Sequence, residues 1–266
     1  MTLEILKRTI KDKSLGAIIV AVILFLYIFW LATFFPEMGS LGNSFQQFAQ
    51  NSAFKAFVGD QVLTLTTYPG FISMEVFSYM GLVVGAFIAF LTASLIAGEI
   101  EQKTSDLLLS LPVSRVSIII QRFIALFPFI LLIMVAMFAA IYGGGAYIGD
   151  PVQVQWFLYA IAFLGAFLLA VAAGSLLISA ILSDGKKAAL VSVGILFAMY
   201  ILENVGSMVT GINWARQLSL FHYTQLINIA VAHEVDWVSM GVLLAFTVIC
   251  LALAAFVFNK RDINVS

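Results

Sequence analysis

Charged residues are scarce in this chain. Only 10% of its 266 residues are charged, whereas 62% are hydrophobic, and the mean hydropathy is +1.08. A soluble globular domain has about 25% charged and roughly 45–50% apolar residues. The composition therefore excludes a soluble domain and predicts an integral membrane protein.

Cysteine and histidine are also rare. The single cysteine, Cys250, lies inside an apolar run, so it excludes an internal disulfide and a thiolate metal cluster, and we interpret it as a small buried hydrophobe. His222 and His233 are eleven residues apart and lack the H-E-x-x-H zinc spacing. No G-x-S-x-G nucleophile elbow is present either. The sequence thus gives no catalytic residue and no metal site, and we expect a protein that is not an enzyme.

A nucleotide-binding P-loop is missing as well. Gly185-Lys186 matches the end of the pattern G-x-x-x-x-G-K-[ST], but Ala180 stands at the position of its first glycine and no Ser or Thr follows Lys186. We therefore expect this chain to hold no ATP in that manner and no cofactor of its own.

Long apolar runs are what the chain has in abundance. A helix needs about 20 apolar residues to cross a hydrocarbon core of about 30 Å. The first run is too long for the apolar region of a signal peptide, so we expect it to be retained as a span. These runs predict an all-α fold of six transmembrane helices, at residues 15–35, 76–97, 123–142, 156–182, 188–208 and 238–258.

The basic residues indicate the orientation. Loops on the cytoplasmic side carry an excess of Lys and Arg. With both termini in the cytoplasm, eleven basic residues fall inside and only Lys55 and Arg216 fall outside. The eleven are Lys7, Arg8, Lys11, Lys13, Lys103, Arg115, Arg122, Lys186, Lys187, Lys260 and Arg261.

Residues 1–14 predict a short amphipathic helix before the first span. Apolar residues recur at helical spacing, and basic residues fill the remaining surface. Such a helix lies in the membrane interface, with its basic face toward lipid headgroups. An ordinary basic tail remains the alternative. The basic residues of this interfacial elbow are Lys7, Arg8, Lys11 and Lys13.

Two segments are expected on the outer side, one too small for a sizeable separate domain and one too short to cross the membrane. Residues 36–75 predict an outer loop with a few short interfacial helices, for example around residues 44–57. The apolar residues 218–231 suit outer re-entrant or interfacial half-helices, which occur at membrane depth only where protein or a water-filled cavity surrounds them.

Glu203 is the one acidic residue that can lie within a span. It follows Lys187 by sixteen residues, or ~24 Å of helix at ~1.5 Å per residue. An ionisable residue at membrane depth suggests function, although Glu203 is near enough to the boundary to reach water. Glu203 and His222 are therefore candidate residues of a gate or path, with a satisfied interfacial histidine as the alternative for His222.

A polar segment at residues 98–117 separates the second and third spans. Its charged side chains cannot lie in lipid, and three leucines recur at helical spacing before Pro112. This pattern predicts a cytoplasmic helix that packs against something. A short helix that only contacts headgroups is the alternative.

Residues 96–115, IAGEIEQKTSDLLLSLPVSR, resemble the segment between the second and third spans of export-type (type 2) ABC transporter permeases. Residues 69–73, PGFIS, resemble the segment that opens the second span in that family. Residues 1–14 resemble its elbow helix, and residues 218–231 its outer re-entrant helices. The resemblance covers the architecture of residues 1–266, a single transmembrane domain, whereas the specific motif covers about twenty residues.

The resemblance implies a permease subunit that forms a dimer and exports a substrate, driven by separate ATP-binding subunits that carry ATP and Mg²⁺. It implies a multi-pass protein of a prokaryotic cell membrane, with lipid and ATPase partners and no nucleic acid. Glu99 and Glu101 would pair with basic residues of the ATPase. The residues assigned to the coupling helix are Glu99, Glu101, Thr104, Leu107, Leu108, Leu111, Pro112 and Arg115.

Two other classes of function remain open from the sequence. A membrane anchor for a cytosolic complex would explain the polar segment but not residues 218–231. An ion-coupled secondary transporter would need several paired ionisable residues near the midplane, and Glu203 alone is available.

Overall fold

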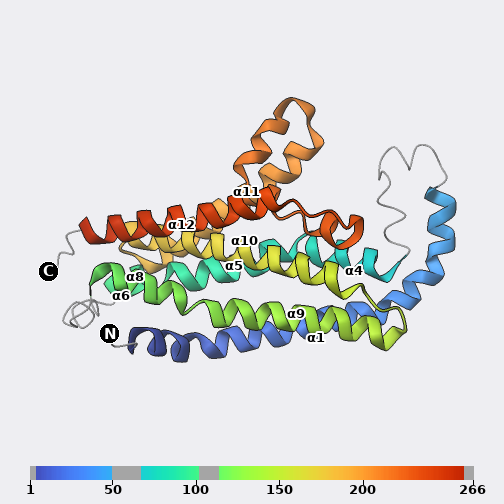
Figure 1. Cartoon of the computed structure of the whole chain (residues 1–266), viewed down its shortest axis with the longest axis horizontal. Coiled ribbons are helices and arrows are strands. Elements are labelled where there is room, and N and C mark those ends of the chain that lie inside the picture. Colours follow the sequence, from blue (N-terminus) through green and yellow to red (C-terminus); the bar gives the residue numbers. More distant parts are fainter. Residues whose placement is uncertain (1–3, 50–66, 102–113, 261–266) are drawn as a thin grey trace.

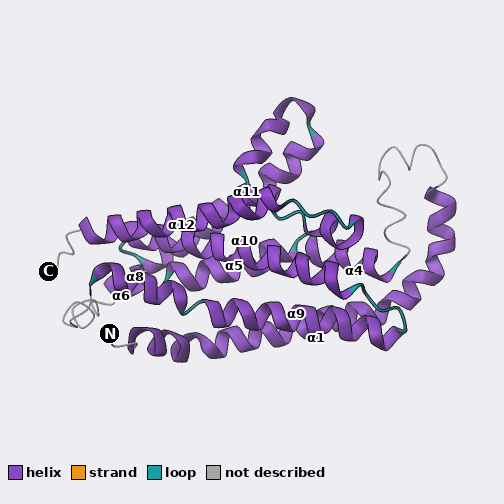
Figure 2. Cartoon of the chain, in the orientation of Figure 1, coloured by secondary structure: helices purple, strands orange, loops and turns teal. Residues whose placement is uncertain are grey.

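The computed structural model describes residues 4–49, 67–101 and 114–260 as a bundle of helices (Figure 1). Within these ranges the chain has helices, turns and loops but no strand (Figure 2), which confirms the all-α prediction. The helices are α1 (Glu4–Ala49), α4 (Tyr68–Phe77), α5 (Met80–Ala93), α6 (Ala97–Glu101), α8 (Arg115–Ile124), α9 (Phe127–Ile148), α10 (Val154–Ile181), α11 (Gly185–Met208) and α12 (Trp237–Lys260), with the short helices η1 (Thr210–Leu218), η2 (Leu220–Tyr223) and η3 (Asn228–Ala232).

Six helical stretches of the described chain are long and apolar enough to cross a membrane, as predicted. The first three begin earlier than expected, at Ile5, Tyr68 and Arg115. The second span begins at Tyr68 because Thr67 caps α4, with its hydroxyl accepting a hydrogen bond from Gly70 N at 3.3 Å. The third begins at Arg115 because Ser114 caps α8 in the same way. The six stretches are Ile5–Glu37, Tyr68–Ala93, Arg115–Ile148, Val154–Ile181, Gly185–Met208 and Trp237–Lys260.

The basic segment at the N-terminus is not a separate elbow helix in this structure. α1 runs without a break from Glu4 through the first span. Ile5 and Thr9 are buried on the same face as Ala17 and Ala21, so this face packs on protein instead of lying among headgroups. The expectation of an elbow at residues 1–14 is corrected accordingly.

The predicted outer loop, residues 36–75, is also partly helical. α1 continues through Pro36 to Ala49 and bends before its C-terminal end (Figure 1). A proline inside a helix removes a backbone hydrogen bond and kinks the helix. Residues 50–66 lie outside the described part. In the other outer segment, η2 and η3 occupy the predicted stretch 218–231 as short helical pieces.

α10 is the central helix of the bundle. It packs against α5, α9, α11 and α12, and its residues Phe157, Phe163 and Phe167 are fully buried. On one side of the bundle α1 and α9 lie side by side (Figure 1). The beginning of α1 and the end of α12 lie at the same end of the bundle, which we name the terminal end (Figure 1).

Gly144 of α9 allows the close contact between α9 and α1. A Cβ atom at Gly144 would lie 2.3 Å from Ala32 Cβ and 2.9 Å from the Tyr68 hydroxyl. The neighbouring Gly143 has nothing within 4 Å of the corresponding position. Small residues at helix crossings of this kind let two helix backbones approach in a membrane.

We predict that Gly144→Ala destabilises the bundle, because overpacking costs about 1–3 kcal/mol. Gly143→Ala is the matched control and should leave stability unchanged or raise it, since Ala is about 1 kcal/mol more favourable than Gly in a helix. The measurement is the free energy of unfolding of each purified variant in mixed micelles. Equal stability of the two variants would contradict the packing described here.

Candidate functional site

Ser179 of α10 holds the break that separates α5 from α6. Its hydroxyl accepts hydrogen bonds from Ile96 N at 3.2 Å and Ala97 N at 3.0 Å, and donates to Ala93 O at 2.6 Å. The side chain is completely buried. Free amides at the beginning of a helix need acceptors, and here one serine of another span supplies the acceptor. The position of α6 relative to α10 is thereby fixed.

Glu99 of α6 forms an ion pair with Arg122 of α8. The Arg122 side chain is only 6% exposed, and its Nη1 also donates to Thr9 Oγ1 of α1 at 2.5 Å. A buried guanidinium is tolerated only when it is paired and hydrogen-bonded. Arg122 therefore joins α6, α8 and α1 through contacts whose loss would cost a large free energy.

Glu101 connects α6 to the beginning of α11. Its carboxylate accepts a hydrogen bond from Gly185 N at 2.9 Å. A Cβ atom at Gly185 would lie 2.9 Å from Gly98 Cα, so the two backbones touch at this point. Asp184 caps α11 by accepting from Lys187 N at 3.0 Å, and this hydrogen bond lowers the pKa of the Asp184 carboxyl.

Arg115 connects α8 to the last span. Its Nη1 donates to Phe258 O and Asn259 O of α12, both at 3.3 Å. Carbonyl groups near a helix C-terminus have no partner within the helix and attract basic side chains. All six spans are thus joined by polar contacts at the terminal end. We name these residues the anchor network: Thr9, Glu99, Glu101, Arg115, Arg122, Ser179 and Gly185.

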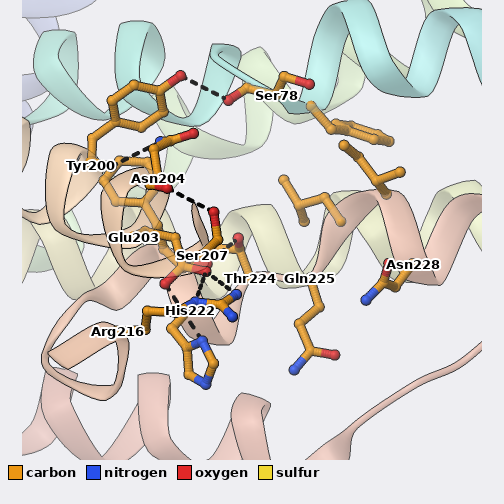
Figure 3. A pocket seen from close by; sticks show the side chains of 14 residues that line it. Ser78, Tyr200, Glu203, Asn204, Ser207, Arg216, His222, Thr224, Gln225 and Asn228 are labelled. Atoms are coloured by element: carbon orange, nitrogen blue, oxygen red, sulfur yellow. Dashed lines mark hydrogen bonds and ion pairs between the residues drawn. The ribbon is translucent and has the colours of Figure 1, made fainter. Parts of the chain in front are cut away.

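A second polar site lies along the second half of α11. It is a pocket of about 450 Å³ between α11, the break between α4 and α5, and the short helices η1 to η3 (Figure 3). We name it the Glu203 pocket. Its lining residues are Phe77, Ser78, Tyr200, Glu203, Asn204, Ser207, Arg216, Phe221, His222, Thr224, Gln225, Leu226, Ile227 and Asn228.

Glu203 is the charged centre of this pocket. Its Oε1 accepts hydrogen bonds from Arg216 Nε at 3.0 Å and Nη2 at 2.6 Å, and its Oε2 lies 3.5 Å from His222 Nδ1 (Figure 3). The ion pair ties α11 to η1, and the histidine contact ties it to η2. The ion pair satisfies Oε1, whereas Oε2 and His222 Nδ1 are buried and make no hydrogen bond within the described chain.

The structure places the predicted site residues as follows. It brings Glu203 and His222 together, although their role as a gate or path stays a prediction. It engages Glu99, Glu101 and Arg115 in contacts inside the chain, and the pairing of the two carboxylates with basic residues of an ATPase stays a prediction. Thr104, Leu107, Leu108, Leu111 and Pro112 lie outside the described residues.

The basic residues of the N-terminal segment lie on the outward side of α1. Lys7, Arg8 and Lys11 are exposed, Lys13 is half-buried, and Arg8 forms an exposed pair with Asp12 at 3.7 Å. This arrangement suits the predicted contact with headgroups even though the segment is not a separate helix.

Sequence reasoning missed Arg122, Ser179 and Arg216 as site residues. Arg122 was counted only as one positive charge for orientation, and Ser179 is one serine within a long apolar run. The available signal for Arg122 was its place within the apolar residues 118–133, where a charge needs a partner. Ser179 carries no such signal, because its role depends on a contact with residues more than eighty positions away.

The six apolar helices and their polar contacts define a multi-pass integral membrane protein. A family model described as ABC-2 family transporter protein matches residues 5–263, so this chain belongs to that family. A comparison with curated proteins gave no significant match. The family assignment confirms the resemblance found in the sequence.

We predict that Arg122→Gln destabilises the protein by about 3 kcal/mol, because it removes the buried guanidinium that pairs with Glu99 and donates to Thr9. Arg8→Gln is the matched control: its ion pair is 70% exposed on the arginine side and should contribute at most about 1 kcal/mol. Unfolding of both variants in mixed micelles measures the difference. A loss in Arg122→Gln no larger than that in Arg8→Gln would contradict the anchor network.

Proposed function

We propose that this chain is the permease subunit of an ATP-driven exporter, acting as a dimer with separate ATP-binding subunits. Membership of the ABC-2 transporter family supports a transport role. The observation that carries the finer proposal is the anchor network. It ties α6, the last described helix before residues 102–113, directly to α8, α10 and α11, and through Arg122 to α1.

The anchor network suits the transmission of force. A partner can drive a membrane protein between two states only through a contact whose free energy differs between those states. In this proposal, the ATP-binding subunit contacts residues 102–113, and Glu99 and Glu101 transmit its movement to the spans. The two carboxylates therefore act within the chain, while Leu107 and Leu108 face the partner.

The chain itself performs no chemistry in this proposal. ATP and Mg²⁺ bind to the partner subunit, and the membrane subunit supplies the substrate path. The terminal end of the bundle lies in the cytoplasm, as the distribution of basic residues favours. The protein is then a multi-pass component of a prokaryotic cell membrane with both termini inside.

The proposal is tested on the double variant Leu107→Ser and Leu108→Ser. We expect the tagged wild-type chain to capture an ATP-binding cassette ATPase when it is purified from its native membrane. The double variant should insert normally but recover at least tenfold less ATPase, because its apolar contact is lost. The measured quantities are the ratio of the two subunits and the ATP hydrolysis of the purified complex.

Lys186→Ala is the control, because Lys186 is an exposed residue near the terminal end but outside residues 98–117. It should leave capture of the ATPase unchanged. Equal capture by the wild type and the double variant would overturn the assignment of the coupling helix. Absence of any ATP-binding subunit from the wild-type preparation would overturn the proposed exporter.

A further inference from the structure

We propose that the Glu203 pocket binds an uncharged sugar group, either of a free saccharide or of a glycolipid headgroup. The pocket volume of about 450 Å³ falls within the range of about 300–1,000 Å³ found for small-molecule sites. The pocket is built from α11, the break between α4 and α5 and the short helices, and none of its lining residues belongs to the anchor network, so its binding can be measured without an ATP-binding subunit.

The charges of the pocket are already used within the protein. Arg216 directs both Nε and Nη2 to Glu203 Oε1, and its Nη1 donates to Asn213 Oδ1 at 3.2 Å. Among the lining residues that the structure describes, Glu203 and Arg216 are the only acid and the only Lys or Arg. The two opposite charges neutralise each other, so the pocket offers a charged ligand no net counter-charge from this pair, whereas a neutral ligand needs none.

Two amide side chains supply the hydrogen bonds for a neutral ligand. Gln225 and Asn228 line the pocket, and within the described chain neither side-chain amide makes a hydrogen bond, as Figure 3 illustrates. Each amide offers two N–H donors and one carbonyl acceptor. A ligand that carries several hydroxyl groups can use both kinds of group at once, since each hydroxyl donates and accepts.

The backbone at Gln225 supports a functional role for its side chain. Its φ of 43° lies in the left-handed region, which residues other than glycine adopt rarely. Such strain persists where the surrounding structure imposes it, and it concentrates at ligand sites. Ile229 N donates to Gln225 O at 3.0 Å and helps to hold this conformation.

Aromatic rings form the apolar part of the wall. Phe221 packs edge-on against Tyr200 at 5.3 Å between ring centroids and lies tilted against Phe167 at 4.8 Å, so its ring is held in place. Phe77 also lines the pocket. The electron-rich face of an aromatic ring attracts the positive edges of C–H groups, and one face of a sugar ring presents such groups. A pocket lined by amides, hydroxyls and aromatic rings suits a sugar better than it suits a purely polar ion.

The test measures binding to the full chain in phosphatidylcholine nanodiscs without nucleotide or ATPase. The probes are glucose, followed by saturation-transfer NMR, and monoglucosyl diacylglycerol, followed by native mass spectrometry. Asn228→Ala removes one amide, and Gln225→Gly removes the other while glycine keeps the left-handed backbone. Each variant should bind about fivefold more weakly, the effect of about one hydrogen bond.

Gln155→Ala is the matched control, since Gln155 is an exposed glutamine at the beginning of α10 and does not line the pocket. It should bind as the wild type does. Binding of glucose supports a free saccharide as ligand, and binding of the glycolipid alone supports a headgroup. No binding of either probe would overturn the proposal, as would equal binding by Asn228→Ala and Gln155→Ala.

A competing result would overturn the proposal as well. Phosphatidylglycerol or phosphatidylethanolamine could bind in preference to the glycolipid and be weakened by Asn228→Ala, which would assign the pocket to a charged headgroup. Because no ATP-binding subunit is present in these experiments, failure of sugar binding leaves the proposed exporter untouched.

Discussion

The buried contact between Arg122 and Glu99 is the constraint on which the terminal end of the bundle depends. The Arg122 side chain is only 6% exposed inside an apolar bundle. Because water does not solvate its guanidinium there, its partners must come from other helices. α6 supplies Glu99 and α1 supplies Thr9. Ser179 and Glu101 then fix the two ends of the same short helix against α10 and α11. The consequence is a terminal end in which α6 has a defined position relative to its neighbours.

α11 physically connects this end to the Glu203 pocket. Its first residue, Gly185, lies in close contact with the α6 backbone, and its N–H donates a hydrogen bond to Glu101. Its second half carries Glu203, whose ion pair with Arg216 holds the short helix η1. A displacement of α6 can therefore be transmitted to the pocket through one continuous helix, α11. The short helices are attached to α11 by side-chain contacts, so they would follow its movement.

The sequence predicted the parts of the fold that depend on local pattern. Six spans, helical secondary structure and the family follow from apolar runs and from residues 96–115. The missed features depend on contacts between distant residues. The elbow was expected because residues 1–14 are amphipathic, but burial of Ile5 and Thr9 against the bundle keeps them in line with α1. The carboxylates of Glu99 and Glu101 looked available to a partner because their partners within the chain lie 23 and 84 positions away.

The most direct test of the account is a distance measurement in the complex with the ATP-binding subunits. Spin labels are placed at Met208, the exposed end of α11, and at Tyr147, an exposed residue near the end of α9, after Cys250→Ala. We expect addition of ATP to change this distance in the otherwise unchanged protein. With Arg122→Gln, the ATPase should still co-purify but the ATP-dependent change should disappear, because α6 is no longer held by α8 and α1. An unchanged ATP-dependent shift in Arg122→Gln would contradict the central role of the anchor network.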